Sequence, residues 1–181
     1  MLDDVTALHA AEVITKIPLP LNGPRGLDLA PDARQLAVTG YFSGNLVLVD
    51  AVAGKVTSTI SLGPAPEPDM VRRGEMIFHD ATYCYQHWSS CATCHPDGGS
   101  DGLSWDLQSY DVGTRGALDH VGELDRPTLI ELWRTAPYLH DGCAGTVGEV
   151  LTKRNRKDQH GQTSHLTDEQ LHDLIEFVLS R

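Results

Sequence analysis

Alternating apolar and polar residues mark the first third of the chain as β structure. Turn signals such as Pro31-Asp32 and Ser43-Gly44-Asn45 separate the alternating runs, as expected for an antiparallel meander. The sequence therefore predicts a four-stranded meander, built from runs at 26–29, 36–39, 46–50 and 55–60. A further short strand is predicted at 13–17, ahead of Pro18 and Pro20.

Helical spacing replaces this alternation after a Pro-rich stretch at 64–68. Asp69 is a good N-cap for a helix over 70–79, and Thr167 with Gln170 forms a capping box ahead of a C-terminal amphipathic helix. A third helix is expected from Leu129 to Trp133. We predict an α+β chain, with a β-meander at 1–63, a linker at 64–68 and an all-α domain at 69–181.

Charge and hydropathy narrow the possible partners. A formal net charge of −11 disfavours nucleic acid and anionic membranes, and suits docking to a basic redox protein. No apolar run approaches the roughly 20 residues that span a bilayer. The first residues carry no apolar signal region. We therefore expect either that an export signal has been removed or that this is the C-terminal part of a longer polypeptide.

The strongest chemical signal is Cys91-Ala92-Thr93-Cys94-His95. Cys-x-x-Cys-His is the attachment motif of a c-type haem, in which both thiols form thioethers and the histidine is an axial iron ligand. A zinc knuckle needs a second ligand pair, and a redox dithiol needs a βαβ setting; neither is evident here. We predict one covalent haem c held by Cys91, Cys94 and His95, and a periplasmic or other extracytoplasmic location, since haem c is attached outside the cytoplasm.

Cys84 and Cys143 are left over after the haem pair. Two spare thiols in an oxidising compartment often pair, so a disulfide between them is a possibility that sequence alone leaves open.

The β region resembles one blade of a YVTN-type β-propeller. The resemblance rests on Pro24-Arg25-Gly26-Leu27-Asp28-Leu29-Ala30-Pro31-Asp32, on Leu36-Ala37-Val38-Thr39-Gly40 and on Leu46-Val47-Leu48-Val49-Asp50 with Gly54-Lys55-Val56; Ala33 replaces the turn glycine. Blades are stable chiefly by stacking on neighbours, and the chain holds no second copy of the repeat. The resemblance therefore implies missing blades before this chain, or a blade that leans on the haem domain.

The helical region resembles a class I-like c-type cytochrome domain. Arg73-Gly74-Glu75-Met76-Ile77-Phe78 is similar to the family's N-terminal helix, and Phe177 is the expected aromatic opposite Gly74. The stretch from Cys84 to Leu107 is similar to cytochrome domains fused behind YVTN propellers. Thr135-Ala136-Pro137-Tyr138-Leu139-His140-Asp141-Gly142 and 146–150 are similar to the C-terminal haem domain of di-haem cytochrome c peroxidases.

Two departures from these families matter. The chain has one Cys-x-x-Cys-His motif, so the second haem of a di-haem peroxidase is absent from it. Met70 and Met76 precede the motif, and no methionine lies where either family has its distal ligand. In class I domains that ligand lies six residues before the leucine that starts the last helix. Here the leucine is Leu166, which makes His160 the first candidate.

Other candidates for the sixth position are His165, His140 or an open iron. The remaining histidines are interpreted as surface or structural: His9, His79, His87, His120 and His172. Trp88, Trp105 and Trp133 are candidates to cover a haem, and Arg126 or Arg134 to pair with a propionate.

Three functions remain in view. The first is single-electron transfer by a His/His haem, which excludes substrate from the iron. The second is a peroxidase-like enzyme with an open distal face and His140 as an acid–base group. The third places the working surface on the propeller, with the haem as a structural or sensory addition.

Overall fold

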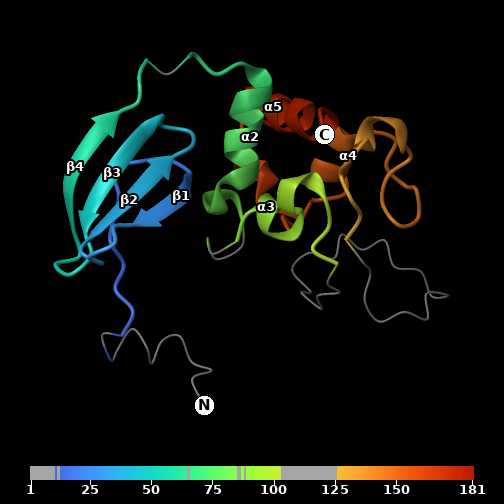
Figure 1. The fold of residues 1–181 in the computed structure, drawn as a ribbon. Coiled ribbons are helices and arrows are strands. Elements are labelled where there is room, and N and C mark those ends of the chain that lie inside the picture. Colours follow the sequence, from blue (N-terminus) through green and yellow to red (C-terminus); the bar gives the residue numbers. More distant parts are fainter. Residues whose placement is uncertain (1–10, 12, 65, 85–86, 88, 103–125) are drawn as a thin grey trace. The chain divides into compact units, whose positions relative to one another are not determined.

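The protein is described by a computed structural model, which covers residues 11, 13–64, 66–84, 87, 89–102 and 126–181. The chain divides into two compact units, Met1–Glu67 and Pro68–Arg181. The division falls inside the Pro-rich stretch. The α+β class is confirmed: the first unit holds one four-stranded antiparallel sheet, and the described helices follow in the second (Figure 1).

The sheet is a meander in which each strand pairs with the next. Its strands are β1 (Pro24–Leu29), β2 (Gln35–Gly40), β3 (Asn45–Asp50) and β4 (Lys55–Ser61), in the order β1-β2-β3-β4. The two later hairpins close at Gly44 and Gly54, whose φ angles of 60° and 63° suit glycine. Ala33 has a φ of 57° in the first turn, a conformation that a glycine would adopt without strain.

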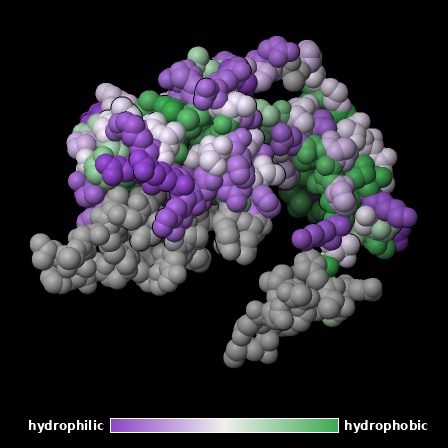
Figure 2. Space-filling model, turned by 180° about the vertical axis from the view of Figure 1, so that it is seen from behind, coloured by the Kyte–Doolittle hydropathy of each residue, from purple (hydrophilic) through white to green (hydrophobic). Residues whose placement is uncertain are grey.

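One face of the sheet is buried at its two central strands, and the outer strands are exposed. Val38, Val47 and Val49 point to the same face and are at most 5% exposed, whereas all residues of β4 and all but one of β1 are exposed. Figure 2 shows hydrophobic surface on this unit. Its exposed large hydrophobic residues are Val13, Leu27, Leu29, Tyr41, Val52, Val56, Ile60 and Leu62.

The strand predicted at 13–17 is wrong. These residues form a bend and irregular chain. Pro18 and Pro20 follow directly, and proline cannot donate to a strand ladder.

The second unit is built around two long helices, α2 (Met70–His79) and α5 (Asp168–Leu179), which pack against each other. Two short helices complete it: α3 (Cys91–Cys94) contacts α2, and α4 (Val147–Leu151) contacts α5 (Figure 1). The core consists of Ile77, Phe78, Val147, Leu174, Phe177 and Val178. Both predicted N-caps are confirmed: Asp69 accepts the Arg72 N–H at 2.8 Å, and Thr167 and Gln170 form the capping box.

Gly74 is the point of closest approach between the two long helices. A Cβ there would lie 2.0 Å from the Asp173 carbonyl oxygen and 2.7 Å from the Phe177 Cβ. Phe177 therefore does meet Gly74, as predicted. Beside this contact Arg73 holds Asp173 through two hydrogen bonds, Nε to Oδ2 at 2.7 Å and Nη2 to Oδ1 at 2.8 Å. Asp173 is only 3% exposed, so this bidentate pair compensates a carboxylate within the packed interface.

The helix predicted from Leu129 to Trp133 is also wrong. The chain forms a turn followed by a single 3₁₀ turn at Leu132–Arg134. Glu131 has a φ of 58°, which breaks a continuous helix, and its N–H donates to the Arg181 carbonyl at 2.8 Å. None of the helices in the described part of the chain is long and apolar enough to cross a membrane.

Candidate functional site

The Cys-x-x-Cys-His motif folds as the one-turn helix α3 with His95 directly after it. The His95 N–H donates to the Cys91 carbonyl at 2.9 Å, and the Ser90 N–H donates to the Thr93 hydroxyl at 3.0 Å. Cys91 packs against the core of the helical unit, and His95 is 7% exposed. The motif is thus a hydrogen-bonded turn that is followed by a buried histidine.

A second histidine lies opposite. His160 belongs to the loop between α4 and α5, and its ring centre is 6.5 Å from that of His95, with 54° between the ring planes. The two residues are far apart in sequence, and the packing of the helical unit brings them together.

The environment keeps both imidazoles neutral. Burial lowers the pKa of His160 to about 4, and the neighbouring His95 and Arg126 add to this shift. Burial also lowers the pKa of His95; weak backbone hydrogen bonding from Gly99 and Pro127 opposes this shift but gives Nδ1 no hydrogen bond of normal geometry. A neutral imidazole has a free lone pair, which is the form that ligates a metal.

Both rings contain a buried polar atom without a partner. The Nδ1 atoms of His95 and His160 are the only buried side-chain nitrogen or oxygen atoms that lack a hydrogen bond within the described part of the chain. Such atoms are uncommon in folded proteins, because an unpaired buried polar group is costly. Two of them in facing histidines indicate a site built for a bound group.

The spacing of the rings fits a metal centre between them. A metal ion bonded to one nitrogen of each imidazole at about 2.0–2.1 Å sets the ring centres roughly 6.4 Å apart. The observed 6.5 Å agrees with this value. Together with two cysteines on α3, the donor set fits a covalently attached haem iron. No group of three or more His, Cys, Asp or Glu residues that could hold a metal ion occurs among the described residues.

The other candidate ligands have exposed positions. His165 ends the 3₁₀ turn Thr163–His165 and is exposed. His140 is exposed in a tight loop that is closed by backbone bonds between Tyr138 and Ala144. Of the histidines interpreted as structural, His172 lies 3.8 Å from Glu176, His87 contacts the Thr82 carbonyl and His79 packs on Phe78; His9 and His120 lie outside the described residues.

Arg126 is the better placed of the two arginine candidates. It is 12% exposed, forms a 2.7 Å ion pair with Asp101, and its charge acts on the pKa of both site histidines. Arg134 is 58% exposed and pairs with neighbouring Glu131. Trp133 is 62% exposed, and Trp88 and Trp105 lie outside the described residues.

All four thiols are free in the structure, so Cys84 and Cys143 are not joined. The Cys84 thiol is buried and hydrogen-bonds with that of Cys91, an interaction that lowers the pKa of Cys84 and raises that of Cys91. Cys143 instead hydrogen-bonds with Asp141, which raises the pKa of its thiol. The spare cysteine Cys84 therefore belongs to the surroundings of the Cys-x-x-Cys-His motif.

Two residues around this site were not identified from the sequence. Asp101, the partner of Arg126, follows the motif in a Gly-rich stretch where an aspartate is interpreted as a turn residue. Asn155 is 4% exposed and holds the loop that contains His160. No periodic pattern marks either residue, because their partners are fixed by tertiary folding.

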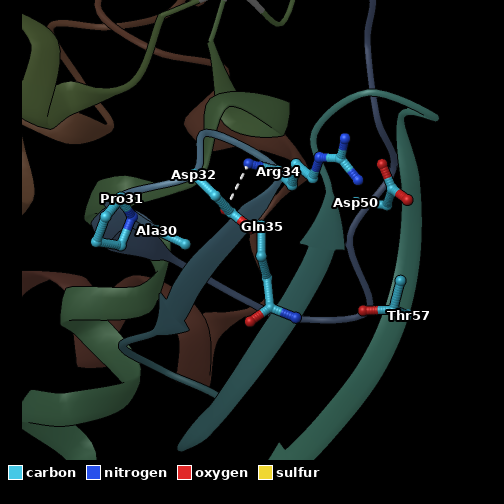
Figure 3. A pocket seen from close by; sticks show the side chains of 7 residues that line it. All are labelled: Ala30, Pro31, Asp32, Arg34, Gln35, Asp50 and Thr57. Atoms are coloured by element: carbon cyan, nitrogen blue, oxygen red, sulfur yellow. Dashed lines mark hydrogen bonds between the residues drawn. The ribbon is translucent and has the colours of Figure 1, made fainter.

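A separate hollow lies in the β unit (Figure 3). It is lined by Ala30, Pro31, Asp32, Arg34, Gln35, Asp50 and Thr57, and the Asp32 carboxylate accepts the Arg34 backbone N–H at 3.0 Å. It is open and contains none of the predicted site residues.

Comparison with known proteins gives one informative similarity. The chain is 30% identical over 145 residues to hydrazine synthase subunit gamma of Kuenenia stuttgartiensis, an alignment that covers 59% of this chain and 39% of that protein. The chain thus spans about two fifths of the length of this relative. No family model matches the chain, and no solved structure matches it.

Proposed function

We propose that residues 68–181 hold one covalently attached haem c and move single electrons through it. The observation that carries this proposal is the facing pair of His95 and His160, with a ring separation of 6.5 Å and an unpaired buried Nδ1 in each ring. The similarity to hydrazine synthase subunit gamma gives this proposal weaker, more general support.

Each residue of the site has a distinct part in this proposal. Cys91 and Cys94 supply the thiols for the two thioethers, and His95 supplies the proximal imidazole. His160 supplies the distal imidazole, which its burial keeps neutral. Arg126 places a positive charge beside both histidines and offers a partner for a carboxylate such as a propionate.

Two protein ligands favour electron transfer over catalysis at the iron. When bound, the haem supplies a one-electron couple, whose potential is lower with two histidines than with a methionine ligand. His160 would hold the position at the iron that a substrate would need, and the bound haem would then supply electron transfer without bond formation. A basic redox protein is the proposed partner of this acidic chain, in an extracytoplasmic compartment.

A second candidate function follows from the similarity to an enzyme subunit. In that case the haem belongs to a redox enzyme whose distal face opens to a small substrate, as in the peroxidase-like alternative. His140, exposed in the loop that Tyr138 and Ala144 close, is the candidate acid–base group of this alternative.

The absorption spectrum of the haem-loaded protein separates the two functions. We expect an oxidised protein that is six-coordinate and low-spin, without a methionine–iron charge-transfer band, and whose haem stays with the chain after denaturation. Cyanide and peroxide should bind slowly. A high-spin spectrum with fast binding of either molecule would exclude the electron carrier and favour the enzyme.

Acid titration of the same protein tests the burial of His160. A protonated imidazole cannot ligate, and the iron competes with the proton for the same nitrogen, so the ligand is lost only at a pH below the pKa of the free imidazole. Because burial lowers the pKa of His160 to about 4, we expect an unchanged low-spin spectrum from pH 7 to about 5. Absorbance measured against pH checks this. Loss of the low-spin form between pH 7 and 5 would contradict a buried His160 ligand.

A further inference from the structure

His160 lies in a loop, and a loop ligand needs something to hold it. The segment from Thr152 to Leu166 connects α4 to α5 and contains a single 3₁₀ turn, Thr163–His165. Gly161 has a φ of 81°, so the chain turns sharply directly after His160. The position of the imidazole therefore depends on contacts made by other parts of this loop.

Asn155 makes most of these contacts from inside the loop. Its Oδ1 accepts the His160 N–H at 2.8 Å, and its Nδ2 donates to the Gly161 carbonyl at 2.7 Å and to the Thr163 hydroxyl at 2.8 Å. The His160 carbonyl lies 3.3 Å from the same Nδ2. One amide thus binds both backbone polar groups of His160 and the residue after it.

The burial of Asn155 gives these bonds their weight. The residue is 4% exposed, so its side chain lies where water has little access. If the amide were removed, the backbone groups that it binds would be left without a hydrogen-bond partner, which is costly in a buried place. Thr163 extends the network by donating to the Leu151 carbonyl at the end of α4. Asn155 therefore ties the backbone of His160 to a helix of the packed unit.

A second set of hydrogen bonds, which does not involve the Asn155 side chain, also holds this loop. Asp158 accepts the backbone N–H and the hydroxyl of Ser164, and the Gln162 N–H donates to the Tyr83 carbonyl at 2.6 Å. The side chain of Asp158 touches neither His160 nor Gly161 in these bonds. It offers a matched control in the same loop.

We propose that Asn155 is a positioning residue for the distal ligand: its amide fixes the backbone of His160 so that the imidazole stays opposite His95. The inference rests on the proposed haem function. Its direct consequence is a slow release of His160, which limits how fast an external ligand reaches the iron.

Cyanide binding to the haem-loaded, oxidised protein measures that release. We expect Asn155→Ala to raise the observed cyanide rate at high cyanide roughly tenfold or more and to add a high-spin fraction at rest. Asn155→Asp, which keeps the shape and Oδ1 but lacks the amide donors, serves if the alanine variant fails to fold, and should also raise the rate. Asp158→Asn should stay within about twofold of the wild type, because asparagine tolerates the φ of 51° at this position.

The reference variant His160→Ala distinguishes a wrong role for Asn155 from a wrong assignment of His160 as the ligand. If it changes the spectrum while folded Asn155 variants keep the wild-type cyanide rate and spin state, the positioning role is wrong and the haem function stands. If His160→Ala itself leaves the spectrum unchanged, His160 is not the ligand, and the proposed role of Asn155 is wrong as well. Far-ultraviolet circular dichroism of each variant shows that a faster rate is not caused by unfolding.

Discussion

Replacing His160 by alanine is expected to convert the oxidised, haem-loaded protein almost completely from low-spin to high-spin. The structure places this imidazole 6.5 Å from His95 between ring centres, and the other candidate histidines His140 and His165 are exposed. Alanine removes the distal donor and leaves a space the size of an imidazole. The absorption and electron paramagnetic resonance spectra report the change, and added imidazole should restore the low-spin form.

The controls for this variant are His140→Ala and His165→Ala. Both residues are exposed, so both variants should fold and keep the wild-type spectrum. A high-spin His165→Ala protein beside a low-spin His160→Ala protein would transfer the distal position to His165. A high-spin His140→Ala protein would point to the loop from 135 to 142 instead.

Elements that are fixed by local chemistry could be predicted from the sequence. The helix at 70–79 has its limits set by the Asp69 cap, and the helix after Thr167 by a capping box, and both occur where they were expected. The four strands follow the alternation of their side chains. The two wrong elements, at 13–17 and at 129–133, are short segments without caps, where proline and a left-handed Glu131 decide the backbone.

Only the residues of the site that are adjacent in the sequence could be predicted from it directly. Cys91, Cys94 and His95 form one motif, whereas His160 was reached by counting back from Leu166 in a resemblance, and its ligation stays a prediction. Asn155 was missed because an asparagine in a loop is ordinarily a turn residue. Asp173 was missed because a charge on a helix is ordinarily solvated; its partner Arg73 is 100 residues away.

Asp173 and Asn155 act in different parts of the helical unit, one at the helix crossing and one in a loop. Asp173 and Arg73 act at the crossing of α2 and α5, which builds the frame. Asn155 acts in the loop, which places one ligand on that frame. Damage to the crossing should therefore destabilise the whole unit, while damage to the loop should change the iron site in a unit that stays folded.

The crossing itself gives the largest expected effect on stability. In Gly74→Ala the new Cβ would lie 2.0 Å from the Asp173 carbonyl oxygen and 2.6 Å from its carbon, and these are backbone atoms that cannot rotate away. The two helices must separate, which weakens both the Phe78–Phe177 contact and the Arg73–Asp173 pair. We expect the free energy of unfolding, measured by urea denaturation of the haem-loaded protein, to fall by about 2–3 kcal/mol.

Gly148→Ala is the matched control for this substitution, since Gly148 also lies in a helix of the same unit and faces α5. Its Cβ would lie 3.4 Å from the Ile175 Cδ1, the mobile end of a side chain that can shift. Alanine also favours the helix over glycine by up to about 1 kcal/mol, so the variant should be as stable as the wild type or slightly more stable. If Gly74→Ala lost less than about 1 kcal/mol, the close crossing of α2 and α5 would not be what holds the unit together.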